Sequence, residues 1–168
     1  LPRRRPQPPG IVNKKQLVAS IVRQLSTEME LIANTAKSAH DEATHDEELH
    51  KNQFETPGLE TSVIAEGQVK VATDLRESID AFRTMPLPEF GPNDAIGLGA
   101  LVEIESGGEK SLYFVGPRAG GLEVDCEAVS VSVITLHSLL CAKLIGRHAG
   151  DILPAAAGRA PMRIVSVQ

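Results

Sequence analysis

The densest group of chemically active side chains in this sequence lies between His40 and Lys51, in the run HDEATHDEELHK. This run holds five carboxylates and three histidines. Crowding like charges on one segment costs stability, so such a cluster indicates a purpose beyond folding. Carboxylate oxygens are also the ligands that hard divalent cations prefer. The segment is therefore suited to reaching a cation site or a basic channel on a larger partner.

The histidines of this run do not follow a known metal-binding pattern. His40, His45 and His50 are spaced by five residues, which turns each side chain about 500° around a helix and off a shared face. The zincin pattern HExxH needs a spacing of four and is absent. A closed metal site built by this protein alone is therefore not expected.

Two other groups of residues have structural interpretations. Gly97-Leu98-Gly99 precedes a strand pattern instead of opening a helix, so it is no dinucleotide-binding fingerprint. Cys126 and Cys141 show no CxxC spacing, and we expect reduced thiols in a cytoplasmic protein. Cys141 falls in an apolar helical pattern without an activating partner, which favours a structural thiol.

Composition excludes several classes of function. The 168 residues are 42% apolar, which is enough for the core of one or two domains. Aromatic residues make up 3% and Trp is absent, so an aromatic-lined ligand pocket is not expected. The net charge of -5 argues against a general nucleic-acid binder. No apolar run approaches the roughly 20 residues of a membrane helix, so we expect no membrane partner.

The N-terminal half predicts a helix that follows a disordered, basic and Pro-rich tail over residues 1–11. From Lys14 to Leu49 apolar residues recur at steps of three and four, and no Gly or Pro interrupts the run. A helix of that length spans about 54 Å. Its apolar stripe consists of Leu17, Ile21, Leu25, Met29, Ile32, Ala36, Ala39 and Ala43.

A second helix is predicted to begin near Thr56, which can cap it, and Pro57, which suits its first turn. Its apolar stripe consists of Ile64, Val71, Leu75, Ile79 and Phe82. Two stripes of comparable length, joined by a short acidic tip, predict an antiparallel coiled-coil hairpin over residues 12–85.

The remainder of the chain changes to a strand pattern after a Pro-rich linker over residues 86–93. Strands are expected near residues 100–105, 111–115, 128–134 and 162–167, with turns at residues 107–108 and 119–121. A short helix is expected over residues 138–145. The sequence therefore predicts an α+β protein, in which residues 94–168 form a small, mostly antiparallel sheet domain.

This layout resembles the bacterial GreA/GreB transcript-cleavage factors, which pair a coiled-coil finger with an FKBP-like domain. The resemblance runs from about residue 12 to residue 167. Residues 134–147, ITLHSLLCAKLIGR, and the following Gly150-Asp151 resemble the family's Ser-Pro-apolar stretch, its Leu-Ile/Leu-Gly and its closing Asp. Leu139 stands in place of the proline. In the finger, residues 48–52, ELHKN, resemble the family's tip Asp-Leu-x-Glu-Asn, and residues 66–69, EGQV, are similar to Glu-Gly-Arg-Ile.

The resemblance implies an accessory factor instead of an enzyme. Its finger would enter the secondary channel of RNA polymerase, and its FKBP-like domain would anchor at the channel rim. Tip carboxylates would help to hold a Mg²⁺ of the polymerase during hydrolysis of backtracked RNA. The chain would need no cofactor of its own and would meet nascent RNA or DNA only indirectly. The implied catalytic residues are Asp46, Glu47 and Glu48, with Glu47 and Glu48 as metal ligands, and the implied partner-binding residues are Ser138, Leu139 and Leu140.

One position departs from the family pattern. Lys51 stands where the family has its second tip acid, and the ammonium group of a lysine repels a cation. A channel-binding regulator that does not stimulate cleavage is therefore an alternative. An FKBP-like prolyl isomerase is the alternative among enzymes, although only Phe90, Tyr113 and Phe114 could form its aromatic walls. A coiled-coil adaptor for other proteins also agrees with the composition.

Overall fold

The computed structural model describes residues 12–49, 58–155 and 157–168. By its internal contacts the chain divides into two compact units. One unit runs up to Ile21 and resumes at Ala81–Gln168, and the other is Val22–Asp80. The first contains a sheet and the second contains most of two helices, so the protein is α+β as predicted.

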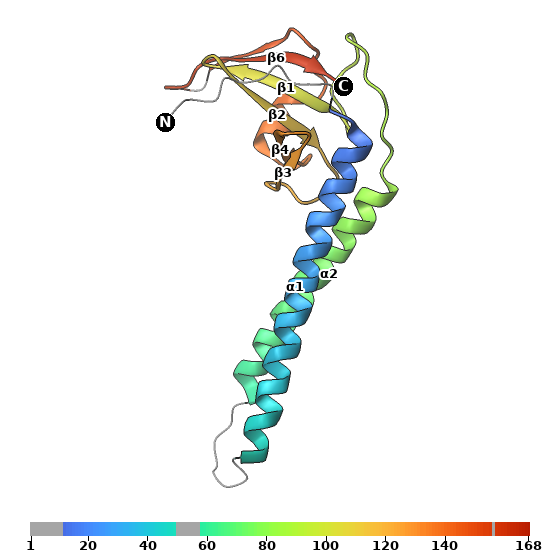
Figure 1. The fold of residues 1–168 in the computed structure, drawn as a ribbon. Coiled ribbons are helices and arrows are strands. Elements are labelled where there is room, and N and C mark those ends of the chain that lie inside the picture. Colours follow the sequence, from blue (N-terminus) through green and yellow to red (C-terminus); the bar gives the residue numbers. More distant parts are fainter. Residues whose placement is uncertain (1–11, 50–57, 156) are drawn as a thin grey trace, which may run out of the picture. The chain divides into compact units, whose positions relative to one another are not determined.

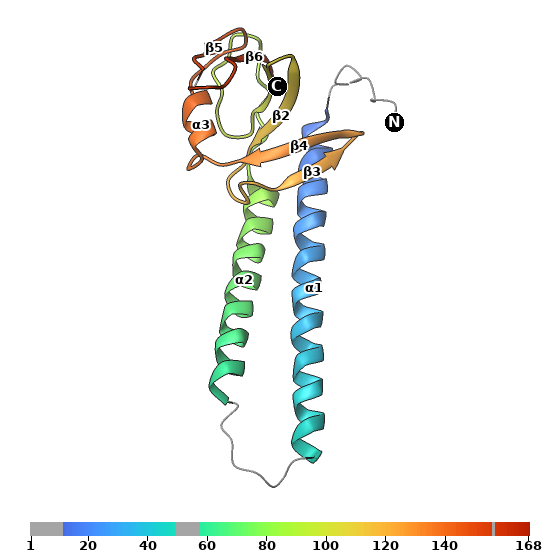
Figure 2. The same ribbon diagram turned by 90° about the vertical axis from the view of Figure 1, so that its left-hand side faces the viewer.

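The helix α1 spans Lys14–Leu49, which confirms the prediction from its apolar stripe. Asn13 begins it, because its side-chain Oδ1 accepts hydrogen bonds from the backbone N–H groups of Lys15, at 2.9 Å, and Gln16, at 3.3 Å. The helix α2 spans Gly58–Thr84. The start signal at Thr56 and Pro57 lies outside the described residues. Within Val22–Asp80 the two helices run alongside each other in both views (Figures 1 and 2).

Burial along the helices follows the predicted stripes with one exception. Leu25, Leu75 and Ile79 are buried in the helical unit. Val71 was predicted on the stripe but is 45% exposed, and its neighbour Ala72 is half-buried instead. Counting back from Phe82 by alternating steps of three and four leads to residue 72, and residue 71 is about 100° away around the axis. The side chains of Ala39, Ala43 and Ile64 lie outside the described set.

The sheet of the other unit has six strands in the order β3-β4-β2-β1-β6-β5. Their bounds are β1 Leu101–Ser106, β2 Glu109–Val115, β3 Glu123–Cys126, β4 Val129–Ile134, β5 Ile152–Leu153 and β6 Met162–Val167. The sheet is mostly antiparallel, as predicted: four strand pairs are antiparallel, and only β2 and β4 are parallel among the described strands. The unpredicted strand β3 causes this: it pairs antiparallel with β4 at the sheet edge and reverses the chain between β2 and β4.

One hydrophobic cluster of this unit lies between the sheet and the short helix α3, Leu139–Leu144. Cys141 and Leu144 of α3 are fully buried and pack with Val102 and Ile104 of β1 and with Ile164 of β6. Figure 2 shows α3 between the end of β4 and the strands β5 and β6. This packing fixes α3 on the sheet, so residues on its outer side have defined positions.

Lys14 fastens the start of α1 to the segment that precedes the sheet. Its Nζ donates hydrogen bonds to the carbonyl oxygens of Pro88 and, at 3.3 Å, of Gly99. The same Nζ lies 4.9 Å from the centre of the Phe90 ring, in the range of a cation–π contact. Burial lowers the pKa of Lys14, and the charge of Glu89 opposes that shift. Lys14, which sequence reasoning did not single out, therefore helps to hold the Pro-rich linker in place.

Candidate docking site on the sheet domain

The start of α3 carries the three residues predicted to bind a partner. Ser138 is the N-cap, with an extended backbone, and its hydroxyl accepts the backbone N–H of Cys141. That bond is 3.0 Å long. Leu140 is half-buried against the core. Leu139 lies between them and is 86% exposed.

Exposed large apolar side chains of the sheet domain are concentrated around α3. Burying an exposed leucine against a partner contributes roughly 1.5–3 kcal/mol, so grouped apolar side chains at a surface favour association. In the sheet domain, all large apolar side chains that are exposed among the described residues fall between residues 136 and 152. They are Leu136, Leu139, Ile145 and Ile152, at 54%, 86%, 40% and 61% exposure. The structure thus places an apolar surface where the sequence predicted a docking segment.

A pocket of about 480 Å³ opens beside the outer side of α3, and its lining includes Lys143, Ile145, Arg147 and Leu153. None of the aromatic residues proposed as prolyl isomerase walls lines it. Phe114 is fully buried, Tyr113 packs against the core and Phe90 contacts Lys14. Within the part of the chain that the structure describes, these three rings therefore do not form an aromatic pocket at this site.

At the tip, the backbone of Asp46, Glu47 and Glu48 lies in the last turn of α1. Successive positions there turn by about 100° around the helix axis. Their side chains lie outside the described set, as do His50 and Lys51 entirely, so the roles assigned to the tip acids remain predictions. Among the side chains that are described, no group of three or more His, Cys, Asp or Glu residues could hold a metal ion.

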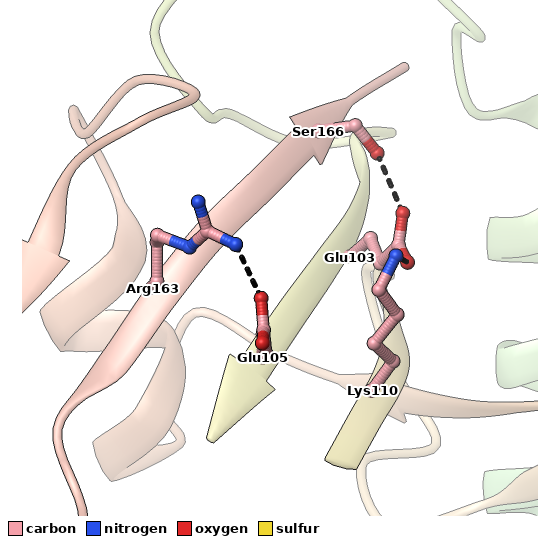
Figure 3. A network of polar contacts seen from close by, with 5 residues as sticks. All are labelled: Glu103, Glu105, Lys110, Arg163 and Ser166. Carbon is pink, nitrogen blue, oxygen red and sulfur yellow. Dashed lines mark hydrogen bonds and ion pairs between the residues drawn. The ribbon is translucent and has the colours of Figure 1, made fainter. Parts of the chain in front are cut away.

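A polar network on the sheet was not anticipated from the sequence (Figure 3). Glu103 of β1 is only 8% exposed at its side chain, and its Oε1 lies 2.9 Å from Lys110 Nζ. Glu103 and Lys110 therefore form an ion pair, but the geometry between them does not satisfy a hydrogen bond to Oε1. The other oxygen, Oε2, accepts a 3.4 Å hydrogen bond from the Ser166 hydroxyl. The spacing of Glu103 and Glu105 by two in a strand was the signal that they share a sheet face.

Glu105 extends this network through Arg163 of β6, the residue opposite it in the antiparallel register. The Arg163 side chain donates a hydrogen bond to Glu105 Oε2. This hydrogen bond, together with the positive charge of Arg163, lowers the pKa of Glu105. The contacts join neighbouring strands, so we interpret the network as structural.

Cys126 and Cys141 form no disulfide bond, and both are buried. Burial raises the pKa of the Cys141 thiol, so its reactive thiolate form is disfavoured. This agrees with a structural thiol. In the described part of the chain, no helix is both long and apolar enough to cross a membrane.

No protein-family model and no curated protein matches this chain. Among solved structures it is similar to GreA factor homolog 1 of Thermus thermophilus, with 20% identity over 88% of this chain and 94% of that one, at a TM-score of 0.36. A structure of the transcription factor Gfh1 matches with 21% identity over 89% and 94%, at a TM-score of 0.37. Gfh1 of Thermus aquaticus matches with 19% identity over 87% and 92%, at 0.35.

Proposed function

We propose that this chain binds bacterial RNA polymerase and regulates transcription elongation. One observation carries the proposal: Leu139, in the segment that resembles the anchoring stretch of GreA/GreB factors, is 86% exposed at the start of α3. A leucine in that position is available to a partner while the rest of α3 is held by the core. Ser138 contributes by fixing the helix start from which Leu139 projects.

The helical hairpin is the second part of the proposal. The 36 residues of α1 form a helix of about 54 Å, a length suited to reaching deep into a channel. The last turn of α1 contains Asp46, Glu47 and Glu48. The first residues of α1 belong to the unit that contains the sheet, so these acidic residues lie at the opposite end of the helix. We propose that this end enters the secondary channel of the polymerase.

The chemistry in this proposal belongs to the polymerase, and the chain acts as an accessory factor. A Mg²⁺ bound there would supply an activated water and charge stabilisation for phosphodiester hydrolysis. Glu48 and Glu47 would help to hold it, with Asp46 beside them, because carboxylate oxygens are suitable ligands for this ion. The lysine at position 51 brings a positive charge to the same segment. The alternative form of the proposal is therefore a finger that occupies the channel without stimulating cleavage.

A titration of bacterial core RNA polymerase with fluorescently labelled full-length protein tests the proposal. Wild type should bind, and Leu139→Asp should bind about tenfold or more weakly, the loss of one interface anchor. A transcript-cleavage assay on stalled elongation complexes then separates the two forms of the proposal. A wild-type protein that does not bind core polymerase contradicts both.

A further inference from the structure

The pocket beside α3 combines an apolar floor with a basic rim. Leu153 of β5 is 2% exposed and belongs to the core, so the floor of the pocket is the edge of the core itself. Ile145 and Pro154 extend the apolar lining. Lys143 and Arg147 add two positive charges, and both residues are exposed. A volume of about 480 Å³ falls in the usual range of sites that take a ligand or an anchoring side chain.

The two cations of the rim have no acidic partner among the described residues. The nearest carboxylate in sequence is Asp151, which is engaged elsewhere: its Oδ2 accepts the backbone N–H of His148 at 2.9 Å. The same oxygen lies 3.9 Å from His148 Nδ1. Lys143 and Arg147 are therefore available to negative charge supplied from outside the chain.

The pocket also continues the apolar surface of Leu139. Lys143 follows Leu139 by four positions in α3, and residues four apart lie on the same helix face. Leu139 and the rim of the pocket can therefore contact one partner segment together.

We propose that this pocket receives an acidic, amphipathic segment of a protein partner. An apolar side chain of that segment would enter above Leu153, and carboxylates beside it would pair with Lys143 and Arg147. Arg147 suits this role because a guanidinium group binds a carboxylate through two parallel hydrogen bonds. The inference rests on the proposed function, in which the segment belongs to RNA polymerase.

Protein is favoured over nucleic acid as the occupant. Nucleic-acid binding draws its affinity from many phosphate contacts and from stacking on aromatic rings. This pocket offers two cations, and no aromatic side chain lines it. Its lining is otherwise apolar, which an RNA or DNA backbone cannot use.

The test compares full-length variants in a titration of core RNA polymerase at about 0.1 M salt, where charges remain effective over roughly 10 Å. The double variant Lys143→Glu/Arg147→Glu should bind about tenfold or more weakly than wild type, because reversed charges repel the acidic segment. Lys143→Gln/Arg147→Gln should give an intermediate loss, and its unchanged thermal unfolding would exclude misfolding. Lys15→Glu is the control for a charge reversal outside the pocket, since Lys15 is exposed and does not line the pocket. It is compared with the single variant Lys143→Glu, which changes the net charge by the same amount. Raising the salt to about 0.5 M should weaken wild type and reduce the difference from the double variant.

Each outcome decides the inference. A graded loss in the order wild type, Gln pair, Glu pair, with Lys15→Glu unchanged, supports the pocket as an acidic-segment site. Polymerase binding that Leu139→Asp weakens but both pocket variants leave intact overturns the inference and keeps the proposed function. No polymerase binding by wild type overturns both. A parallel titration with a labelled single-stranded RNA supplies the other arm: RNA binding that is lost in the Glu pair would show a nucleic-acid site and overturn the inference.

Discussion

The ring of Phe82 lies over Gly116, the residue that follows β2. A Cβ atom at Gly116 would stand 2.9 Å from Phe82 Cζ and 3.0 Å from Val133 Cγ1, closer than carbon atoms normally approach. Phe82 is 1% exposed and Val133 is fully buried, so neither side chain has space to move away. The last turns of α2 therefore pack on the sheet at a position where the chain needs glycine for space.

Gly116→Ala should destabilise the sheet domain by about 1–3 kcal/mol, the usual cost of overpacking a filled core. Unfolding in urea, followed by circular dichroism, measures the loss. Gly67→Ala is the matched control, because Gly67 lies in α2 and an added Cβ meets no atom within 4 Å. Alanine there should raise helix stability by roughly 1 kcal/mol. Equal stability of Gly116→Ala and wild type would contradict the packing of Phe82 on Gly116.

Ser138 and Leu139 are adjacent, but substitution of Ser138 should lower stability, whereas substitution of Leu139 should lower the affinity for polymerase. Ser138→Ala removes the cap of α3 and should cost about 1 kcal/mol of stability, with a smaller effect on polymerase binding. Leu139→Asp replaces an exposed side chain and should change stability by less than about 0.5 kcal/mol. Its effect should appear in the affinity for polymerase. Thermal unfolding and the polymerase titration, run on both variants, separate the two roles. A large loss of stability in Leu139→Asp would contradict the exposed position of this residue.

The elements that the sequence predicted well are those with a strong period and clear ends. The helix Lys14–Leu49 has an apolar stripe that no Gly or Pro interrupts, and the strand Met162–Val167 directly follows Pro161. The turn at residues 107–108 was predicted from its two glycines, and both have positive φ. In each case the local pattern and the tertiary packing favour the same structure.

The elements that were missed lack a clear local signal in the sequence. The strand β3 has only four residues, and its backbone beyond Cys126 passes through Glu127 and Ala128, both with positive φ. Such residues carry no turn signal in the sequence. The parallel pairing of β2 with β4 follows from β3 and was missed with it. The resemblance singled out Leu139, whereas Lys143 and Arg147 became candidates only because the structure shows them lining a pocket together with Leu153.

The pairing of Arg163 with Glu105 predicts a pH-dependent contribution to stability. Arg163 lowers the pKa of Glu105 from its ordinary value of 4.5, so the native state binds fewer protons than the unfolded state as the pH falls. The contribution should be fully present above about pH 4.5 and should be lost as the pH falls through the native pKa. Arg163→Gln should therefore be less stable than wild type near pH 7, and the two should converge at acidic pH, once the pH has fallen below the native pKa of Glu105. Denaturation series at several pH values measure this difference. Arg163→Lys, which keeps the charge, should retain part of the effect, and a difference that grows toward acid would contradict the pairing.

The acidic tip gives the last prediction, which concerns chemistry on the polymerase. If the finger stimulates cleavage of backtracked RNA, Glu48→Ala should lower the rate by about tenfold or more while polymerase binding changes little, because in the proposal the carboxylate acts on the metal and Leu139 provides the anchor. Lys51→Glu should raise the rate, since it removes a repelling charge and restores the second acid of the family pattern. The measurement is cleavage of labelled transcript in stalled elongation complexes at a saturating concentration of this protein.

The protein alone should cleave no RNA, because a single acidic helix end does not provide a preorganised two-metal site. Identical cleavage above background by wild type and both variants would exclude the tip acids as the chemical site. Binding by all three without cleavage would instead favour a regulator that occupies the channel, and the positive charge at position 51 is then the simplest physical reason.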